Sequence, residues 1–251
     1  MKRSNLIFAL AGALAALLAG SSFAVAQSDA SFEKANQEYS QGKFREAIDH
    51  YEVAVHAGQW SAPLFYDLGN AYFRTGDFGR AILNYERALA LEPNHPETQA
   101  NLRIARDEVR GLELPQGWPE RLLRFANLNE YTVAAATAFW LGILFLVIMI
   151  FAQRRRRRLI ALSVLSFTIF ALLVYALVSI ESGAKGRSLA IITGSGVQAR
   201  LATADNAGSV LALPPGSEVR IERERGDWVY AGLPNNLHGW VPARSLEVVR
   251  L

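Results

Sequence analysis

The chain has 251 residues, of which 51% are apolar, and it contains no cysteine, which excludes disulfides, cysteine zinc sites and thiol catalysis. The formal net charge is +3, but Lys2, Arg3 and the five arginines from Arg154 to Arg158 lie in two short segments. Without them the chain has 19 basic against 23 acidic residues, a mildly acidic balance that argues against nucleic-acid binding.

Residues 1–26 have the pattern of a secretory signal peptide. Lys2 and Arg3 precede an apolar stretch from Leu6 to Leu18, and Ala24-Val25-Ala26 is a small-x-small cleavage site. The alternative is a permanent N-terminal anchor, for which the apolar stretch is short. In both cases we expect Gln27 and the following residues to be exported.

Residues 27–112 contain a repeat with a period of 34, in which Gly42 and Tyr51 are in phase with Gly76 and Tyr85. The second unit carries the fuller pattern Phe65, Leu68, Gly69, Tyr72, Gly76, Phe78, Ala81, Tyr85, Ala88 and Pro93. This pattern resembles the tetratricopeptide repeat (TPR), a helix–turn–helix unit. It predicts units at 28–61 and 62–95, followed by a polar capping helix at 96–111 in which Arg103 and Arg106 replace the usual glycine and tyrosine.

The first helices of such units line a concave binding groove. The residues predicted to face it are Asn36, Tyr39, Tyr66, Asn70, Phe73 and Arg74. Asn36 and Asn70 are in phase, and paired asparagine amides suit the backbone of an extended peptide. Alternatively, these are ordinary helix-surface residues and the aromatic rings pack between units. So few repeats make a shallow groove, so we expect a composite site that a partner or the membrane completes.

Residues 113–132 are predicted to be a juxtamembrane linker, in which Trp118 and Tyr131 suit an interfacial aromatic belt. Residues 133–152 and 159–180 contain no charged side chain, and each is long enough to span a membrane as a helix.

Gln153 and the arginines Arg154, Arg155, Arg156, Arg157 and Arg158 separate the two apolar segments. Burying each arginine in lipid would cost about 2.5–3.5 kcal/mol, so residues 153–158 are predicted to form a loop in water. The positive-inside rule places this loop in the cytoplasm and both flanking regions in the periplasm. Polar side chains of the second span, Ser163, Ser166, Thr168 and Tyr175, are predicted to bond neighbouring helices.

Residues 187–251 alternate between short strand patterns and turn signals, which predicts a small barrel. Val197 to Arg200, Pro215-Gly216, Trp228 and Gly239-Trp240-Val241 resemble the pattern of the bacterial SH3-like domain. We expect Trp228 and Trp240 in the core, with an exposed ligand platform as the alternative. Residues 201–204 differ from that family's Ser-Gly-Pro stretch, so no ligand contact is carried over from it.

The whole order of segments resembles the Bat aerotolerance family of bacterial membrane proteins, in particular its E-type TPR member. That resemblance implies an adaptor that acts with membrane proteins carrying von Willebrand factor A domains. The fold class expected is a multi-domain membrane protein with all-α TPR repeats, a two-helix transmembrane hairpin and a small all-β SH3-like barrel.

The sequence contains no pattern that predicts catalysis, a metal site or a cofactor. The histidines His50, His56, His95 and His238 lack metal-ligand spacing, and Gly194-Ser195-Gly196 precedes a strand where a dinucleotide fingerprint requires a helix. We therefore expect a non-enzymatic scaffold on the periplasmic face of the bacterial inner membrane. One alternative is a sensor or targeting protein that binds cell-wall peptidoglycan through the SH3-like domain, and another is an accessory to a membrane enzyme.

Overall fold

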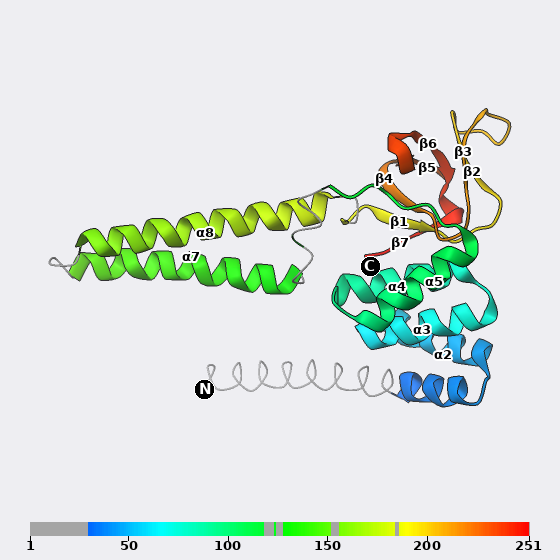
Figure 1. The fold of residues 1–251 in the computed structure, drawn as a ribbon, viewed down its shortest axis with the longest axis horizontal. Coiled ribbons are helices and arrows are strands. Elements are labelled where there is room, and N and C mark those ends of the chain that lie inside the picture. The colour runs from blue at the N-terminus through cyan, green and yellow to red at the C-terminus, as the bar shows by residue number, and fades with distance from the viewer. Residues whose placement is uncertain (1–29, 118–122, 124–127, 152–155, 184–185, 251) are drawn as a thin grey trace, which may run out of the picture.

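The computed structural model describes residues 30–117, 123, 128–151, 156–183 and 186–250. The expected signal peptide, Trp118, Arg154 and Arg155 lie outside these residues. Figure 1 shows a long hairpin of two helices beside a stack of shorter helices, which is covered on one side by a β-sheet.

The helical stack begins with a helix at residues 30–40. It continues with α2 (Phe44–His56), α3 (Ala62–Thr75), α4 (Phe78–Leu91) and α5 (Pro96–Val109). The boundaries follow from local chemistry: the side chains of Ser61 and Asp77 accept hydrogen bonds from the first turns of α3 and α4. Gly76 ends α3 with a left-handed φ of 81°. The helix pairs predicted from the 34-residue period are confirmed.

Small and aromatic residues interlock within each helix pair. An added Cβ on Gly69 would lie 2.7 Å from the ring of Tyr85, so α3 and α4 approach closely only with glycine there. The ring pairs Tyr39–Phe44 and Phe73–Phe78 repeat at the same positions of the two units, with centroids 5.2 and 5.3 Å apart.

The hairpin consists of α7 (Leu128–Phe151) and α8 (Arg156–Ser182), which run antiparallel and are both long and apolar enough to cross a membrane. The hydroxyl groups of Ser163 and Ser166 donate to backbone carbonyls of α7 at 3.2 and 2.7 Å. The predicted bonding of these two serines to a neighbouring helix is confirmed. Thr168 instead donates within its own helix, and Tyr175 is 63% exposed.

Both helices are longer than the apolar runs that predicted them. Helix α7 begins at Leu128 rather than Val133. A prediction made from hydropathy misses its first turn, because that turn is polar. Arg156, Arg157 and Arg158 form the exposed first turn of α8 rather than part of a loop. Arginine is a good helix former, so the helix continues past the end of the apolar segment.

The C-terminal region forms one antiparallel sheet of seven strands in the order β3-β2-β6-β5-β4-β1-β7. The strands are β1 (Leu189–Ile192), β2 (Val197–Arg200), β3 (Ser209–Leu213), β4 (Glu218–Arg225), β5 (Trp228–Gly232), β6 (His238–Pro242) and β7 (Leu246–Val248). These positions confirm the strands predicted from alternation and turn signals, and they show an antiparallel sheet with β3 and β7 at its two ends.

Strand β1 joins the sheet to the helices because it is buried on both faces. Leu189 and Ile191 belong to the same hydrophobic cluster as the helical stack, whereas Ala190 and Ile192 belong to the core of the sheet. Successive side chains of a strand point to opposite faces, so one apolar strand can serve two cores. The helical stack and the sheet are therefore packed as one unit.

Gly79 on α4 shows how close this packing is. An added Cβ would lie 3.1 Å from backbone atoms of Thr193 and 3.2 Å from the carbonyl oxygen of Ile192. The corresponding position of the first repeat is Arg45, which is exposed. The second repeat thus carries glycine at the point where the sheet lies against it.

Candidate functional site

Asn36 and Asn70 both bind tyrosines of their own repeat. The Tyr51 hydroxyl donates to Asn36 Oδ1 at 2.5 Å, and the Tyr85 hydroxyl donates to Asn70 Oδ1 at 2.8 Å. Burial raises the pKa of both tyrosines, so the hydroxyls remain protonated donors. The two asparagines are in phase because each links the first helix of its unit to the second. The amide nitrogens are the donors left to bind a ligand.

A third amide continues this arrangement onto α5. Asn101 Nδ2 donates to Asn70 Oδ1 at 2.9 Å, and the Tyr66 hydroxyl lies 3.4 Å from the same nitrogen. The Tyr66 ring also contacts His95, with centroids 5.3 Å apart. Sequence reasoning missed Asn101, because the repeat pattern breaks down in α5. We call the face shared by the helix at 30–40, α3 and α5 the first-helix face.

The other residues predicted to face the groove pack at the edges of the repeats. Tyr39 and Phe73 lie against the first residue of the following helix, as the ring pairs above show, and both are half-buried. The Arg74 guanidinium lies 4.3 Å from the centroid of the Phe44 ring and so bridges the two units. The structure therefore brings Asn70 and Tyr66 together, and it places Tyr39, Phe73 and Arg74 at the turns.

Asp67 supplies a carboxylate next to these groups. It lies on α3 between Tyr66 and Asn70, and burial raises its pKa to about 6. Among the described residues it has no ion-pair or hydrogen-bond partner. A carboxylate that is desolvated but unpaired would be stabilised by a cation, so the first-helix face is suited to a basic side chain of a partner.

Arg106 forms the polar centre of the contact between helices and sheet. Its Nη2 contacts Glu86 at 2.5 Å and also binds Glu218 on β4, while Nη1 lies 3.2 Å from Glu113. Glu218 is fully buried, and its other oxygen accepts a hydrogen bond from the Leu114 backbone amide. Burial lowers the pKa of Arg106, but the three carboxylates together outweigh burial and raise it. Helix α5 was predicted to be a polar cap, but at Arg106 it makes a buried contact with the sheet.

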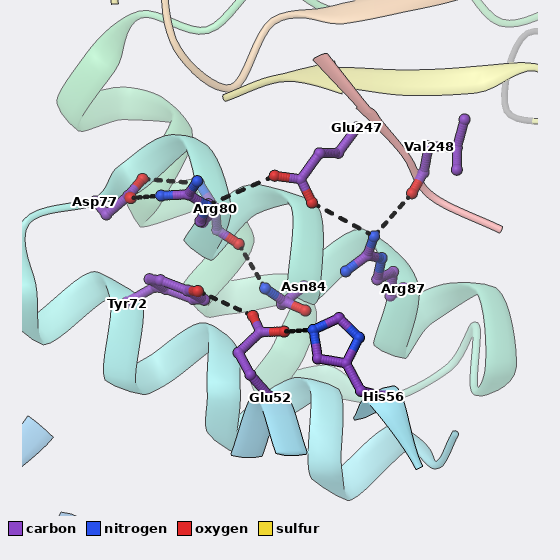
Figure 2. A network of polar contacts seen from close by, with 9 residues as sticks. All are labelled: Glu52, His56, Tyr72, Asp77, Arg80, Asn84, Arg87, Glu247 and Val248. Carbon is purple, nitrogen blue, oxygen red and sulfur yellow. Dashed lines mark hydrogen bonds and ion pairs between the residues drawn. The ribbon is translucent and has the colours of Figure 1, made fainter. Parts of the chain in front are cut away.

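A second polar network ties β7 to α4 (Figure 2). Glu247 lies 3.5 Å from Arg80 Nε and 3.8 Å from Arg87 Nη2, and Arg87 Nη2 also donates to the Val248 carbonyl at 3.1 Å. Beside it, the Tyr72 hydroxyl donates to Glu52 at 2.9 Å. These contacts place the last strand of the chain against the second repeat.

Trp228 and Trp240 lie on the outer face of the sheet and not in its core. Both are half-exposed, whereas Val229 and Val241 beside them are buried. Tyr230 pairs with Trp240 across β5 and β6, with ring centroids 5.1 Å apart, and stacks on His238 at 5.9 Å. The expectation of core positions fails because the alternation of these strands puts the small and branched residues inside.

Comparison with known families shows a tetratricopeptide repeat at residues 62–95, the second helix pair. Such repeats in general mediate protein–protein interactions. A search of curated proteins finds no match. Within the residues that the structure describes, no group of three or more histidine, aspartate or glutamate side chains is placed to hold a metal ion.

Replacing Asp67 should change stability in a pH-dependent way. The folded pKa of about 6 exceeds the ordinary value of 3.8, so the folded state binds more protons between these values and stability falls as the pH rises through this window. We expect Asp67→Asn to stabilise the protein by about 1 kcal/mol near pH 7, after allowance for solvent screening, and to have no effect below about pH 4. Urea unfolding of the full chain in detergent at several pH values measures this. Exposed Asp107→Asn is the control, and a pH-independent gain would contradict the assignment.

Removing the Arg106 guanidinium should loosen the sheet from the helices. Arg106→Met removes the guanidinium group that binds the buried carboxylates of Glu86 and Glu218, and we expect a loss of about 3–5 kcal/mol in the free energy of unfolding. The matched control is Arg103→Met, one turn earlier on the exposed side of α5, with an expected change below about 0.5 kcal/mol. Adding Glu218→Gln, which keeps an acceptor for the Leu114 amide, should recover part of the loss. Equal stabilities of the two methionine variants would contradict the role of Arg106.

Proposed function

We propose that this protein is a membrane-anchored, non-enzymatic scaffold that presents two interaction modules together on one membrane face. The observation that carries the proposal is the packing of the repeats and the sheet into one unit, which lies beside the end of the hairpin where α7 begins and α8 ends (Figure 1). A unit whose two halves precede and follow the hairpin in sequence is compatible with a hairpin that enters and leaves the membrane on the same side.

The hairpin supports membrane anchoring through the side chains it exposes. Trp140, Val133 and Ile150 are 67, 66 and 71% exposed, and further large apolar residues of α7 and α8 are exposed around them. Leaving apolar surface in water costs about 25 cal/mol per Å², and a bilayer removes this cost. Together with the signal peptide and the arginine cluster of the sequence, this supports insertion in the bacterial inner membrane with the packed unit in the periplasm.

The first-helix face is the proposed partner site. The sheet packs against α4 and β4 binds α5 through Arg106, whereas Asn36 is exposed and Asp67 and Asn70 are half-buried. Amides suit the backbone of an extended segment, and Asp67 suits a basic side chain in it. The resemblance to the E-type Bat proteins supports membrane partners with von Willebrand factor A domains. It also supports an envelope complex of the aerotolerance or stress type.

The aromatic face of the sheet supports a second candidate function. Tyr230, Trp240 and His238 form a row of half-exposed or exposed rings on β5 and β6. In an SH3-like domain such a row can serve as a platform, which would make the protein a sensor or targeting factor that binds peptidoglycan. Retention of the intact, detergent-solubilised protein on isolated murein, lost in Trp240→Ala, would favour this function. If the protein is not retained on murein, the scaffold function remains the better supported proposal.

The absence of cysteine allows a direct test of topology. Single cysteines in place of exposed Asp107 and Asn206 should react with a membrane-impermeant maleimide in cells whose outer membrane is permeabilised. A cysteine in place of Arg157 should react only after the inner membrane is broken, because it lies at the other end of α8. Labelling of positions 107 and 206 on opposite sides would refute the common face.

Partner capture tests the site itself. Crosslinking of the intact protein in its native membrane should recover a membrane protein with a von Willebrand factor A domain. Asp67→Lys should reduce its yield several-fold, because it places a cation where a basic side chain is expected to bind. Asp49→Lys, the same charge change at an exposed position of α2, is the control and should leave the yield unchanged. Equal yields from both variants would exclude the first-helix face as the site.

A further inference from the structure

A cavity of about 220 Å³ lies where the repeats, the residues that follow β7 and the first turn of α7 meet. Its apolar wall includes Trp60, Phe65 and Leu91 from the repeats and Leu128 from α7. Arg87 and Arg250 also line it. The volume is below the range of about 300–1,000 Å³ typical for drug-sized ligands, so the cavity suits one part of a larger molecule.

The apolar side of the cavity has the properties of a membrane-interface surface. Trp60 is 53% exposed, and its indole nitrogen donates to the Val55 carbonyl at 3.3 Å, so the polar atom is satisfied within the protein. Leu91, in the last turn of α4, is 38% exposed. A tryptophan beside the first turn of a membrane-spanning helix lies at the depth where such rings are enriched.

The cationic side of the cavity is formed by Arg87 and Arg250, which are both desolvated in part. Arg87 is 7% exposed, and its Nε has no hydrogen-bond partner among the residues that the structure describes. Its carboxylate partner Glu247 is shared with Arg80. Burial lowers the pKa of Arg250, and nearby Arg187 lowers it further against the opposing effect of Glu181. Two desolvated guanidinium groups facing one cavity favour an anionic ligand with oxygen acceptors.

We propose that this cavity binds the phosphoglycerol part of an anionic phospholipid from the leaflet in which α7 begins. The phosphate binds Arg87 and Arg250, and the first acyl carbons contact Trp60 and Leu91 while the chains remain in the bilayer beside α7. The bound lipid thereby fixes how the packed unit stands on the membrane. This inference rests on the membrane insertion proposed above.

The test uses the full chain in nanodiscs of phosphatidylcholine mixed with phosphatidylglycerol, followed by native mass spectrometry of the lipids that remain bound. We expect the wild type to retain phosphatidylglycerol preferentially. Arg250→Gln should reduce this preference about tenfold, as expected for the loss of a charge-assisted hydrogen bond, and Trp60→Ala should reduce it as well. Arg244→Gln, which removes an exposed arginine from the same sheet domain, is the matched control and should change nothing.

The outcomes separate this inference from the proposed function. A chain that does not enter nanodiscs refutes the anchor and the lipid site together. A chain that enters but retains both lipids equally, or loses phosphatidylglycerol equally in Arg250→Gln and Arg244→Gln, refutes the lipid site alone. A photoreactive residue at position 91 should form an adduct with lipid, and an adduct with another protein chain would overturn the assignment. Competition by free glycerol phosphate at bulk concentrations similar to those of the lipid would show a plain anion site and would also overturn it.

Discussion

A buried guanidinium group holds the two folded regions of this protein together. Arg106 on α5 binds Glu86 of the second repeat and Glu218 of the sheet, and the second oxygen of Glu218 accepts from the Leu114 amide. Burying such charges is costly unless they are paired and hydrogen-bonded, and breaking one pair is strongly destabilising. Because 112 residues separate Arg106 from Glu218, this contact closes a loop that contains both apolar helices.

Closing that loop restricts where α7 and α8 can lie. The helices α7 and α8 must leave from and return to one packed unit, which their antiparallel pairing achieves. The sheet occupies the α4 side of the repeats through β1, which serves two cores. This packing leaves Asn36 on the first-helix face and His238 on the aromatic face exposed, and the cavity lies at the start of α7.

Sequence patterns predicted most of the secondary-structure elements, but they did not predict the contacts between distant segments. The 34-residue period and the strand alternation are visible in the sequence itself, so the helix pairs and the short strands of residues 187–251 could be predicted from it. The buried contacts of Arg106 could not be predicted, because an arginine in a polar helix is expected to be solvated. Only the folded structure brings the carboxylate of Glu218 to it. A signal of the docking was present in the uniformly apolar run Leu189 to Ile192, which indicates a strand buried on both faces, and in Gly79 where the first repeat has Arg45.

The contacts that the predicted groove residues make within the protein could not be derived from the sequence. Asn70 and Tyr66 were expected on the first-helix face, but the hydroxyl of Tyr85 and the amide of Asn101 reach Asn70 only through the packing of three helices.

Double electron–electron resonance between spin labels at Arg103→Cys and Arg223→Cys, in the full chain in nanodiscs, tests the docked unit most directly. A single narrow distance distribution is predicted, because α5 and β4 are held by Arg106. A broad distribution, as expected for two domains that move independently, would contradict it.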